Sequence, residues 1–216
     1  MENVSLDAMR LELAPAVASA AAFDGWNEAA VRTAAEQCSV NPDAAVYAFS
    51  DGPMAMIAAW IGWVDQQMNA ALPAEQLAAM KIRDRIRALV LARLDAMAPY
   101  KEALRRAQAI MAMPQNVPQS LKLGWHSADA MWRAAGDTAT DYNHYTKRMT
   151  LGSIYAATLA VYVSDTSADH GETKAFLERR IENIMQFEKA KARLLKNDLE
   201  QFSPARLLGR LRYPAR

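Results

Sequence analysis

The chain is poor in the residues that build disulfides. Its single cysteine, Cys38, excludes a disulfide within the chain and fits a reducing compartment. Cys38 lies in an Ala-rich segment with a helical pattern, and free cysteines are usually small apolar core residues. We therefore expect Cys38 to be a buried filler rather than a nucleophile.

Common catalytic motifs are also missing. The sequence has no Gly-x-Gly-x-x-Gly, no phosphate-binding loop and no Gly-x-Ser-x-Gly. Its three histidines, His126, His144 and His170, form no Glu-x-x-His pair. Asp141 and His144 share one helical face, but two such side chains alone are more often a hydrogen-bonded pair. We therefore expect no catalytic residue, no bound metal and no cofactor, and we rank a metal enzyme third among the hypotheses.

Long hydrophobic runs are absent too. The longest uncharged run, Met149–Ser164, falls short of the ~20 apolar residues that a membrane span requires, and no secretory signal pattern is visible. Apolar residues make up 52% of the chain and charged residues 23%, values that argue against disorder. Abundant Ala and Met with few β-branched runs predict an all-α protein, either soluble or peripheral to a membrane.

Charge is distributed unevenly, although the net charge is only +1. Residues 22–60 carry five carboxylates against Arg32, a net charge of −4. The segment from Lys189 to Arg216 has a net charge of +6. These two asymmetries bear on which partners each end of the chain can bind.

The N-terminal segment has the pattern of a helix-turn-helix. Predicted helices cover 5–22, Asn27–Cys38 and Asn41–Phe49, with Asn27 as a cap and Pro42 at a first helical position. The third of these is in the place of a recognition helix, yet it offers one carboxylate and no cation. Because DNA affinity depends on Lys and Arg neutralising phosphates, this charge argues against nucleic-acid binding.

The middle of the chain predicts strongly apolar helices. Met54–Leu72 is apolar nearly all round, which is typical of a core helix or of one that lines a cavity. Another helix is predicted to begin at Pro73 and to continue through an apolar stripe that ends at Met97. On the opposite face of that helix, a solvated row of cations is expected at Lys81, Arg83, Arg85 and Arg87.

The stretch Asp129–Arg148 gathers large polar-tipped side chains around Gly136, which we interpret as a left-handed helix stop. Thr140 and Asp141 are a plausible N-cap and first turn of the next helix. An ordinary helix corner needs only a cap and a glycine. The excess of aromatic and charged residues instead favours a protein–protein surface.

Two long C-terminal helices are predicted, at Asp141–Ser164 and Thr173–Leu195. The first has apolar or small residues on two faces, so the pair could form a four-helix dimer interface with a second copy. Residues Phe202–Arg216 form a basic amphipathic tail, which either contacts an anionic membrane surface or remains a solvated terminus.

The corner and its flanks resemble a known family. Their residues are similar to the signature of the ubiquinone-biosynthesis accessory family of Coq-nine proteins. The matching residues are Trp132, the run Ala135-Gly136-Asp137, the run Thr140-Asp141-Tyr142-Asn143 and the run Tyr145-Thr146-Lys147-Arg148. The similarity continues through Phe176–Ile181 and covers most of residues 5–195. It implies a homodimeric, TetR-repressor-like all-α fold with a degenerate helix-turn-helix.

The resemblance also implies a function. Such proteins bind lipid, are not enzymes, and present isoprenoid quinone precursors to the di-iron demethoxyubiquinone hydroxylase. It therefore implies an isoprenoid quinone or phospholipid ligand, with peripheral membrane contact. A ligand-responsive transcriptional regulator of the TetR type is the alternative.

The chain is predicted to consist of three parts. The parts are a helix-turn-helix-like module at 1–52, a lipid-binding and dimerisation domain at 53–200 and a tail at 201–216. The chain departs from eukaryotic relatives at His144, where they usually have Trp, and in its short Arg-rich tail. With no targeting segment visible, we expect a bacterial cytoplasmic protein associated peripherally with the inner membrane.

Site residues are predicted in three sets. The residues expected to contact the partner are Asp129, Trp132, Asp141, His144, Tyr145 and Arg148. Those expected to bind lipid are Ile57, Trp60, Ile61, Val90, Trp125, Tyr155 and Leu159, and those expected to contact the membrane are Arg206, Leu207, Leu208, Arg210 and Leu211.

Overall fold

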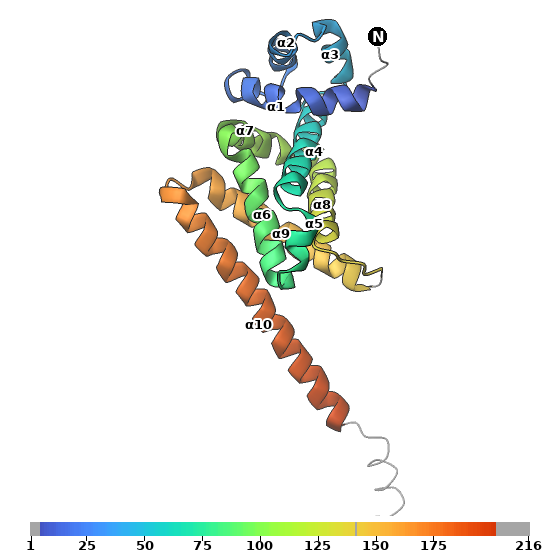
Figure 1. The fold of residues 1–216 in the computed structure, drawn as a ribbon, viewed down its shortest axis with the longest axis vertical. Helices are drawn as coiled ribbons and strands as arrows, with labels where there is room; N and C mark the ends of the chain where they lie inside the picture. Colours follow the sequence, from blue (N-terminus) through green and yellow to red (C-terminus); the bar gives the residue numbers. More distant parts are fainter. Residues whose placement is uncertain (1–4, 141, 202–216) are drawn as a thin grey trace, which may run out of the picture.

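The structure, a computed structural model, describes the backbone of residues 5–140 and 142–201, and the side chains of residues 5–140 and 143–186. Within these ranges every regular element is helical, which confirms the all-α prediction. Three N-terminal helices lie across one end of a helical bundle, and the last helix extends beyond the bundle at the other end (Figure 1). The α-helices are α1 Leu6–Asp24, α2 Glu28–Gln37, α3 Pro42–Ala48, α4 Pro53–Ala71, α5 Ala74–Ala78, α6 Ile82–Met97, α7 Lys101–Met111, α8 Val117–Ala134, α9 Tyr142–Ser164 and α10 Gly171–Gln201.

The helix-turn-helix pattern is present, with the predicted cap at Asn27 and the predicted first helical position at Pro42, while Asn41 is a cap that was not predicted. Asn27 Oδ1 accepts a hydrogen bond of 3.2 Å from the backbone N–H of Ala30, at the start of α2. Asn41 Oδ1 accepts one of 3.1 Å from Ala44 N–H, and Pro42 is the first residue of α3. Each cap satisfies donors that a helix start leaves unpaired, which fixes where these short helices begin.

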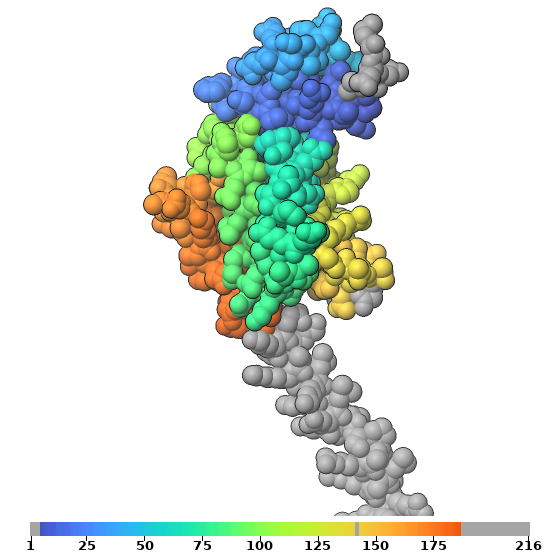
Figure 2. Space-filling view, viewed as in Figure 1, coloured from blue at the N-terminus to red at the C-terminus, as the bar shows by residue number. Residues whose placement is uncertain are grey.

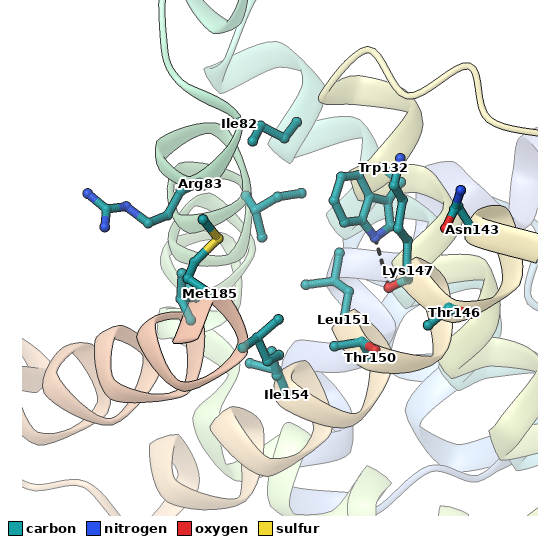
Figure 3. A pocket seen from close by; sticks show the side chains of 13 residues that line it. Ile82, Arg83, Trp132, Asn143, Thr146, Lys147, Thr150, Leu151, Ile154 and Met185 are labelled. Carbon is teal, nitrogen blue, oxygen red and sulfur yellow. Dashed lines mark hydrogen bonds between the residues drawn. The ribbon is translucent and has the colours of Figure 1, made fainter. Parts of the chain in front are cut away.

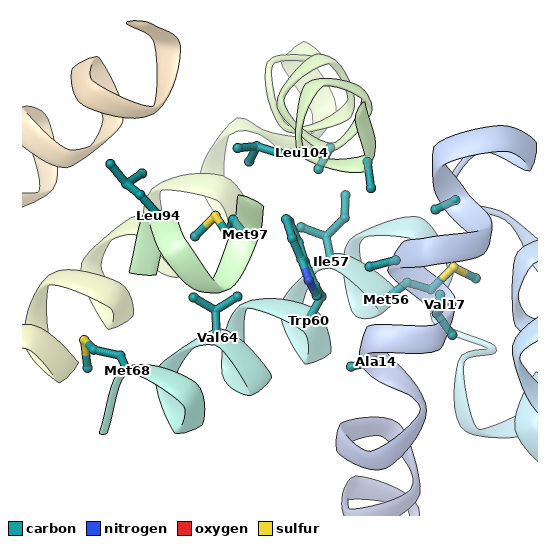
Figure 4. Packing of buried hydrophobic residues seen from close by; sticks show 14 of the residues in the cluster. Ala14, Val17, Met56, Ile57, Trp60, Val64, Met68, Leu94, Met97 and Leu104 are labelled. Carbon is teal, nitrogen blue, oxygen red and sulfur yellow. The ribbon is translucent and has the colours of Figure 1, made fainter. Parts of the chain in front are cut away.

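The core of the protein lies around Trp60 of α4, which is 1% exposed (Figure 4). Its ring packs against Trp26 with centroids 5.5 Å apart and against Tyr100 at 6.1 Å. Trp26 Nε1 donates a hydrogen bond of 3.0 Å to the carbonyl of Ala103 in α7. These contacts join the N-terminal helices to the bundle, because Trp26 lies in the turn between α1 and α2.

The prediction of one continuous helix from Pro73 to Met97 is wrong. The chain forms the short α5, leaves the helical conformation and starts again at Ile82. Arg85 occupies this break and donates hydrogen bonds to the carbonyls of Ala78 at 3.0 Å, Met80 at 3.0 Å and Ala135 at 2.8 Å. A cation at the carbonyl ends of two helices, α5 and α8, is favoured by their unpaired acceptors and their dipoles.

The cations of α6 were expected to cover a solvated face, but two of them also form ion pairs with α10. Arg83 lies 3.5 Å from a carboxylate oxygen of Glu182, and Arg87 lies 2.5 Å from one of Glu178. Both carboxylates belong to α10, so these ion pairs hold α10 against α6. Each pair is partly exposed and therefore contributes about 1 kcal/mol or less.

The exposure of side chains among the described residues bears on two predictions, the burial of Cys38 and the second apolar face of α9. Cys38 is exposed, so the expectation of a buried filler is wrong. On α9, Ala156, Ala157 and Ala160 are exposed, while Tyr155 and Tyr162 face the core. That pattern matches the two faces predicted for this helix, and dimerisation through the exposed one remains a prediction.

No single helix among the described residues has the length and hydropathy of a membrane span. The helices α3 and α4 reach the required values only as a pair, and they are bent by 92° relative to each other. Much of the apolar surface of α4 is buried in the core, including Ile57 and Val64 at 0% exposed.

Candidate functional site

The predicted corner is a left-handed helix stop at Gly136, whose φ is 86°. Gly136 N–H donates to the carbonyl of Arg133, and Asp137 N–H donates to that of Trp132, both at 2.9 Å. This pair of reversed hydrogen bonds is the Schellman ending of a helix, and its left-handed position favours glycine. The stop lets α9 fold back beside α8.

A buried ion network holds the two helices together at this corner. Arg148 is 2% exposed, and its guanidinium donates from Nε to Asp129 at 2.6 Å and from Nη1 to Asp137 at 3.1 Å. Asp137 also accepts a hydrogen bond of 2.7 Å from Lys147 Nζ. Burial opposes ionisation of Asp137, but the hydrogen bonds from Lys147 and Arg148 outweigh it and hold its pKa below the usual range.

The burial of Arg148 changes the role expected for it. Arg148 was predicted to contact the partner, but its side chain points into the protein and also donates to the carbonyl of His144 at 3.1 Å. Asp129 is directed toward it and has only 17% of its side chain exposed. Arg148 is thus a residue that positions the start of α9, rather than a surface contact.

Aromatic side chains gather on the outer side of the same corner. Tyr145 is 58% exposed, and its ring lies 5.2 Å from that of His144 and 5.9 Å from that of Trp125. Leu121, 71% exposed, lies one turn before Trp125 on α8, and Met149, 67% exposed, lies one turn after Tyr145 on α9. We call these five residues the docking surface. The helices that carry it form one edge of the molecule in Figure 2, where they are yellow and gold.

The docking surface differs from the predicted set in two ways. Trp125 was expected to contact lipid, but its ring contacts His144 and Tyr145 instead. Leu121 and Met149 were not predicted, although each follows the four-residue spacing of its helix from an aromatic neighbour. Exposed large apolar side chains that lie together are typical of interaction sites.

His144 is half-buried and fixed by the corner. Its Nδ1 lies 2.9 Å from the carbonyl of Ala139, a geometry in which the ring N–H donates to that oxygen. Asp141, the other member of the predicted pair, lies outside the described residues. Across the ranges that the structure describes, no three His, Cys, Asp or Glu side chains are arranged to hold a metal ion.

A pocket of about 300 Å³ lies behind the corner, between α6, α9 and α10. Its wall on the α8–α9 side includes Trp132, whose Nε1 donates a hydrogen bond of 3.0 Å to the carbonyl of Lys147 (Figure 3). The opposite side is formed by α10. The lining is largely aliphatic and consists of Ile82, Arg83, Ile86, Trp132, Asn143, Thr146, Lys147, Thr150, Leu151, Ile154, Ile181, Ile184 and Met185.

None of the seven residues predicted to bind lipid lines this pocket. Ile57, Trp60 and Val90 are buried in the core with at most 1% of their surface exposed, and Ile61 and Leu159 pack against that core. Tyr155 faces a different neighbour, because its hydroxyl accepts a hydrogen bond of 2.9 Å from Arg93 Nε. Core residues and pocket residues are both apolar, so apolar character does not separate the two sets.

One predicted partner residue lines the pocket, and the five predicted membrane-contact residues lie beyond the part of the chain that the structure describes. Trp132, predicted as a partner contact, lines the pocket instead of the outer surface. The membrane-contact residues Arg206, Leu207, Leu208, Arg210 and Leu211 lie outside the described residues.

Comparison with known sequences agrees with the family resemblance. The COQ9 family profile matches residues 117–188, which include α8, the corner and α9. The mitochondrial ubiquinone biosynthesis protein COQ9 of Rattus norvegicus is 34% identical over 168 residues, covering 74% of this chain and 54% of the rat protein. The human protein of the same name is 33% identical, with 74% and 52% covered. The chain therefore spans about half the length of these relatives.

Comparison with solved structures supports the fold. A TetR transcriptional regulator from Nitrosomonas europaea superposes with a TM-score of 0.63 at 21% sequence identity. The match covers 80% of this chain and 95% of the regulator. At this identity the likeness establishes the helical architecture alone. The chain belongs to the COQ9 family and has a TetR-like all-α fold.

Proposed function

We propose that this chain is a non-enzymatic accessory protein of ubiquinone biosynthesis that binds an isoprenoid lipid and presents it to the demethoxyubiquinone hydroxylase. One observation carries the proposal: the pocket and the docking surface lie on opposite sides of the same pair of helix segments. Trp132 and Lys147 line the pocket, while His144 and Tyr145 belong to the docking surface. A ligand bound behind α8 and α9 is therefore close to a partner that docks in front of them.

The ligand is an isoprenoid quinone precursor or a related lipid. The aliphatic lining of the pocket suits a hydrocarbon chain, because small-molecule sites are mostly apolar with a few polar groups that orient the ligand. The relatives' names supply the pathway, since each is a ubiquinone biosynthesis protein.

The partner binds at the docking surface through Tyr145 and its neighbours. Aromatic side chains with polar tips bury a large area at low entropic cost, and they are enriched among residues that dominate interface affinity. His144 provides less apolar area than the Trp of eukaryotic relatives, so Leu121 and Met149 gain importance here. Asp129 and Arg148 support the surface from behind, and Asp141 remains a proposed contact.

Dimerisation and membrane association complete the proposal. The exposed Ala face of α9 suits close packing against the same helix of a second copy, with α10 beside it. The basic tail at 201–216 provides peripheral contact with the inner membrane through its cations. No nucleic acid is involved.

Native mass spectrometry of the purified protein tests this function, because it reports bound lipid and oligomeric state together. We expect a dimer that carries isoprenoid, and addition of the purified hydroxylase should give a ternary assembly. Protein that is consistently empty, and that does not take up an isoprenoid quinone when one is added, would contradict the proposal.

A TetR-type transcriptional regulator is the second candidate, favoured by the helix-turn-helix order and by the similarity to the Nitrosomonas regulator. The charges of the module argue against it. Arg32 is paired with Glu28 at 2.9 Å and Asp43 at 3.2 Å, and Arg10 is paired with Asp51 at 3.0 Å. Salt-dependent binding to upstream DNA at physiological ionic strength would favour the regulator.

A further inference from the structure

The docking surface contains an imidazole, that of His144, whose ring is held in one orientation. The ring lies 6.2 Å from that of Trp125 and 5.2 Å from that of Tyr145, the second contact being edge-to-face. Its Nδ1 lies 2.9 Å from the carbonyl oxygen of Ala139, in the turn before α9. Because these three contacts fix the ring, its hydrogen-bonding properties are a defined part of the surface that a partner meets.

The contact with Ala139 fixes which nitrogen carries the proton in the neutral ring. A carbonyl oxygen can only accept, so His144 Nδ1 is the donor of this bond. The other nitrogen, Nε2, then has no hydrogen and carries a lone pair. His144 therefore contributes a hydrogen-bond acceptor to the docking surface as long as its ring is uncharged.

The other members of the docking surface differ from His144 in what they offer a partner. The indole of Trp125 can only donate, and the hydroxyl of Tyr145 can donate or accept. Leu121 and Met149 offer mainly apolar area. A partner that covers the surface removes water from Nε2, and a buried acceptor left without a donor costs binding free energy. The partner must therefore supply an N–H or O–H group at this point.

The ionisable side chains around His144 come from both helices and from the turn between them. On α9, Arg148 donates a hydrogen bond of 3.1 Å to the His144 carbonyl, and Lys147 pairs with Asp137 of the turn at 2.7 Å. Asp129 of α8 pairs with Arg148 at 2.6 Å. Carboxylates ordinarily titrate below about pH 5, and lysine and arginine above about pH 9. Histidine is the side-chain type that ordinarily changes charge between these limits.

We propose that His144 determines which group of the partner fits the corner: the neutral ring accepts a hydrogen bond at Nε2 from an N–H or O–H donor of the hydroxylase. The inference rests on the proposed function, which supplies the partner. The protonated ring carries a hydrogen on both nitrogens, so it meets that donor with a second donor and a charge. Docking is therefore strongest when the ring is uncharged, and it weakens in mild acid. Tyr145 supplies buried area, whereas His144 supplies specificity.

The test measures binding of the purified hydroxylase to the full-length protein by calorimetry at pH 8.0 and at pH 5.5. His144→Asn keeps an amide donor for the carbonyl of Ala139 but has no acceptor in the place of Nε2. It should bind at least tenfold more weakly than wild type at pH 8.0, and within threefold of wild type at pH 5.5. Comparing the two proteins at equal pH cancels any titration of the hydroxylase itself.

Two further variants keep the test decisive. His144→Gln places an amide oxygen near the position of Nε2, and an amide takes up no proton in this pH range. It should bind within threefold of wild type at pH 8.0 and at least threefold more tightly than wild type at pH 5.5. His126→Asn replaces an exposed histidine of α8 that is not part of the docking surface, so it should match wild type at both pH values.

Three results overturn the inference and leave the proposed function intact. The first is a wild-type advantage over His144→Asn that grows in acid, because the partner then offers an acceptor to a cationic ring. The second is equal binding of wild type and His144→Asn at pH 8.0, and the third is a pH effect that His126→Asn removes. If His144→Asn does not fold, weaker binding of His144→Gln than of wild type at pH 5.5 overturns the inference. If the hydroxylase does not bind wild type at either pH, the proposed partner fails, and this inference fails with it.

Discussion

Arg148 and Asp129 are 19 residues apart in the sequence, and the Arg148 Nε lies 2.6 Å from the Asp129 carboxylate across the Gly136 corner. Arg148 is 2% exposed and has no route to solvent that would compensate for a lost partner. The contact joins α8 to α9 directly behind the docking surface. The position of Tyr145, three residues before Arg148, therefore depends on a buried ion pair.

Replacing Arg148 should destabilise the protein strongly. Arg148→Met leaves Asp129 and Asp137 without their shared cation, and breaking a buried pair in this way commonly costs about 3–5 kcal/mol. We expect a loss in this range in the free energy of unfolding, measured by urea denaturation. Arg133→Met is the matched control, because Arg133 also pairs with Asp129 but has 74% of its side chain exposed. The distinction between the buried Arg148 and the exposed Arg133 would be contradicted if Arg133→Met lost more than ~1 kcal/mol of unfolding free energy, or if Arg148→Met lost less than that.

Replacing Tyr145 should weaken binding of the partner and leave the fold unchanged. Tyr145→Ala removes an exposed ring at the centre of the docking surface, and truncation of such anchors commonly costs ~2 kcal/mol or more of binding free energy. We expect hydroxylase affinity to fall by about thirtyfold or more in calorimetry, with the melting temperature unchanged. Tyr47→Ala is the control, since Tyr47 is 68% exposed on α3, far from the corner in sequence. If Tyr145→Ala unfolds the protein instead, the residue is part of the core packing and the docking assignment fails.

Features with a local chemical cause could be predicted from the sequence. Asn27 marks a helix start because its side chain pairs with an N–H group three residues ahead, and Pro42 marks another because proline suits the first helical position. Gly136 marks a helix end because the left-handed conformation there strains other residues. These signals need only neighbouring residues, and together they give the helix-turn-helix and the corner.

Features that depend on distant contacts could not be predicted. The break between α5 and α6 has no glycine or proline of its own, and it is held by Arg85 through the carbonyl of Ala135, 50 residues away. Apolar character does not distinguish Trp60, a core residue, from Ile154, a pocket residue. The charge of Arg148 suggested a surface, because its two carboxylate partners are assembled only when α9 folds back on α8.

Asp165 lies between α9 and α10, and its carboxylate accepts four hydrogen bonds. Its carboxylate accepts from the N–H and hydroxyl of Ser167 at 2.8 and 2.6 Å, and from those of Thr173 at 2.9 and 2.5 Å. The hydroxyl groups of Ser167 and Thr173, followed by the two backbone N–H groups, hold the pKa of Asp165 far below its usual range. The ionised form therefore fastens the start of α10.

The lowered pKa of Asp165 predicts a loss of stability in acid. Above the unfolded-state pKa of about 3.9 both states are ionised and the full stabilisation is present. Below it the unfolded chain takes up a proton that the folded chain refuses, so stability falls as the pH drops toward the folded pKa. In urea midpoints measured between pH 2.5 and 7, Asp165→Asn should show a shallower acid decline than wild type.

Thr173→Val provides the intermediate case for Asp165. It removes the hydroxyl donor and keeps the backbone N–H donor, so the pKa of Asp165 should rise part of the way to its usual value. The acid decline of this variant should lie between those of wild type and Asp165→Asn. Identical pH profiles for the three proteins would show that Asp165 does not contribute to acid sensitivity.

The two candidate lipid sites on α9 can be separated by filling each with a larger side chain. Ile154 lines the pocket, whereas Leu159, five residues later, packs against the core outside it. Ile154→Trp should reduce farnesol affinity at least tenfold, because the indole occupies space that the chain needs. Leu159→Trp should cost about 1–3 kcal/mol of stability through overpacking but leave farnesol affinity within about threefold.

Calorimetry with farnesol gives the affinity of each variant, and urea unfolding of the same two variants gives their stability. Should Leu159→Trp abolish binding while Ile154→Trp does not, the lipid lies in the core region first predicted from the sequence and not behind the docking surface. The opposite result ties the ligand to the wall that Trp132 and Lys147 share with that surface. It would thereby connect lipid binding to the same helices that carry Tyr145.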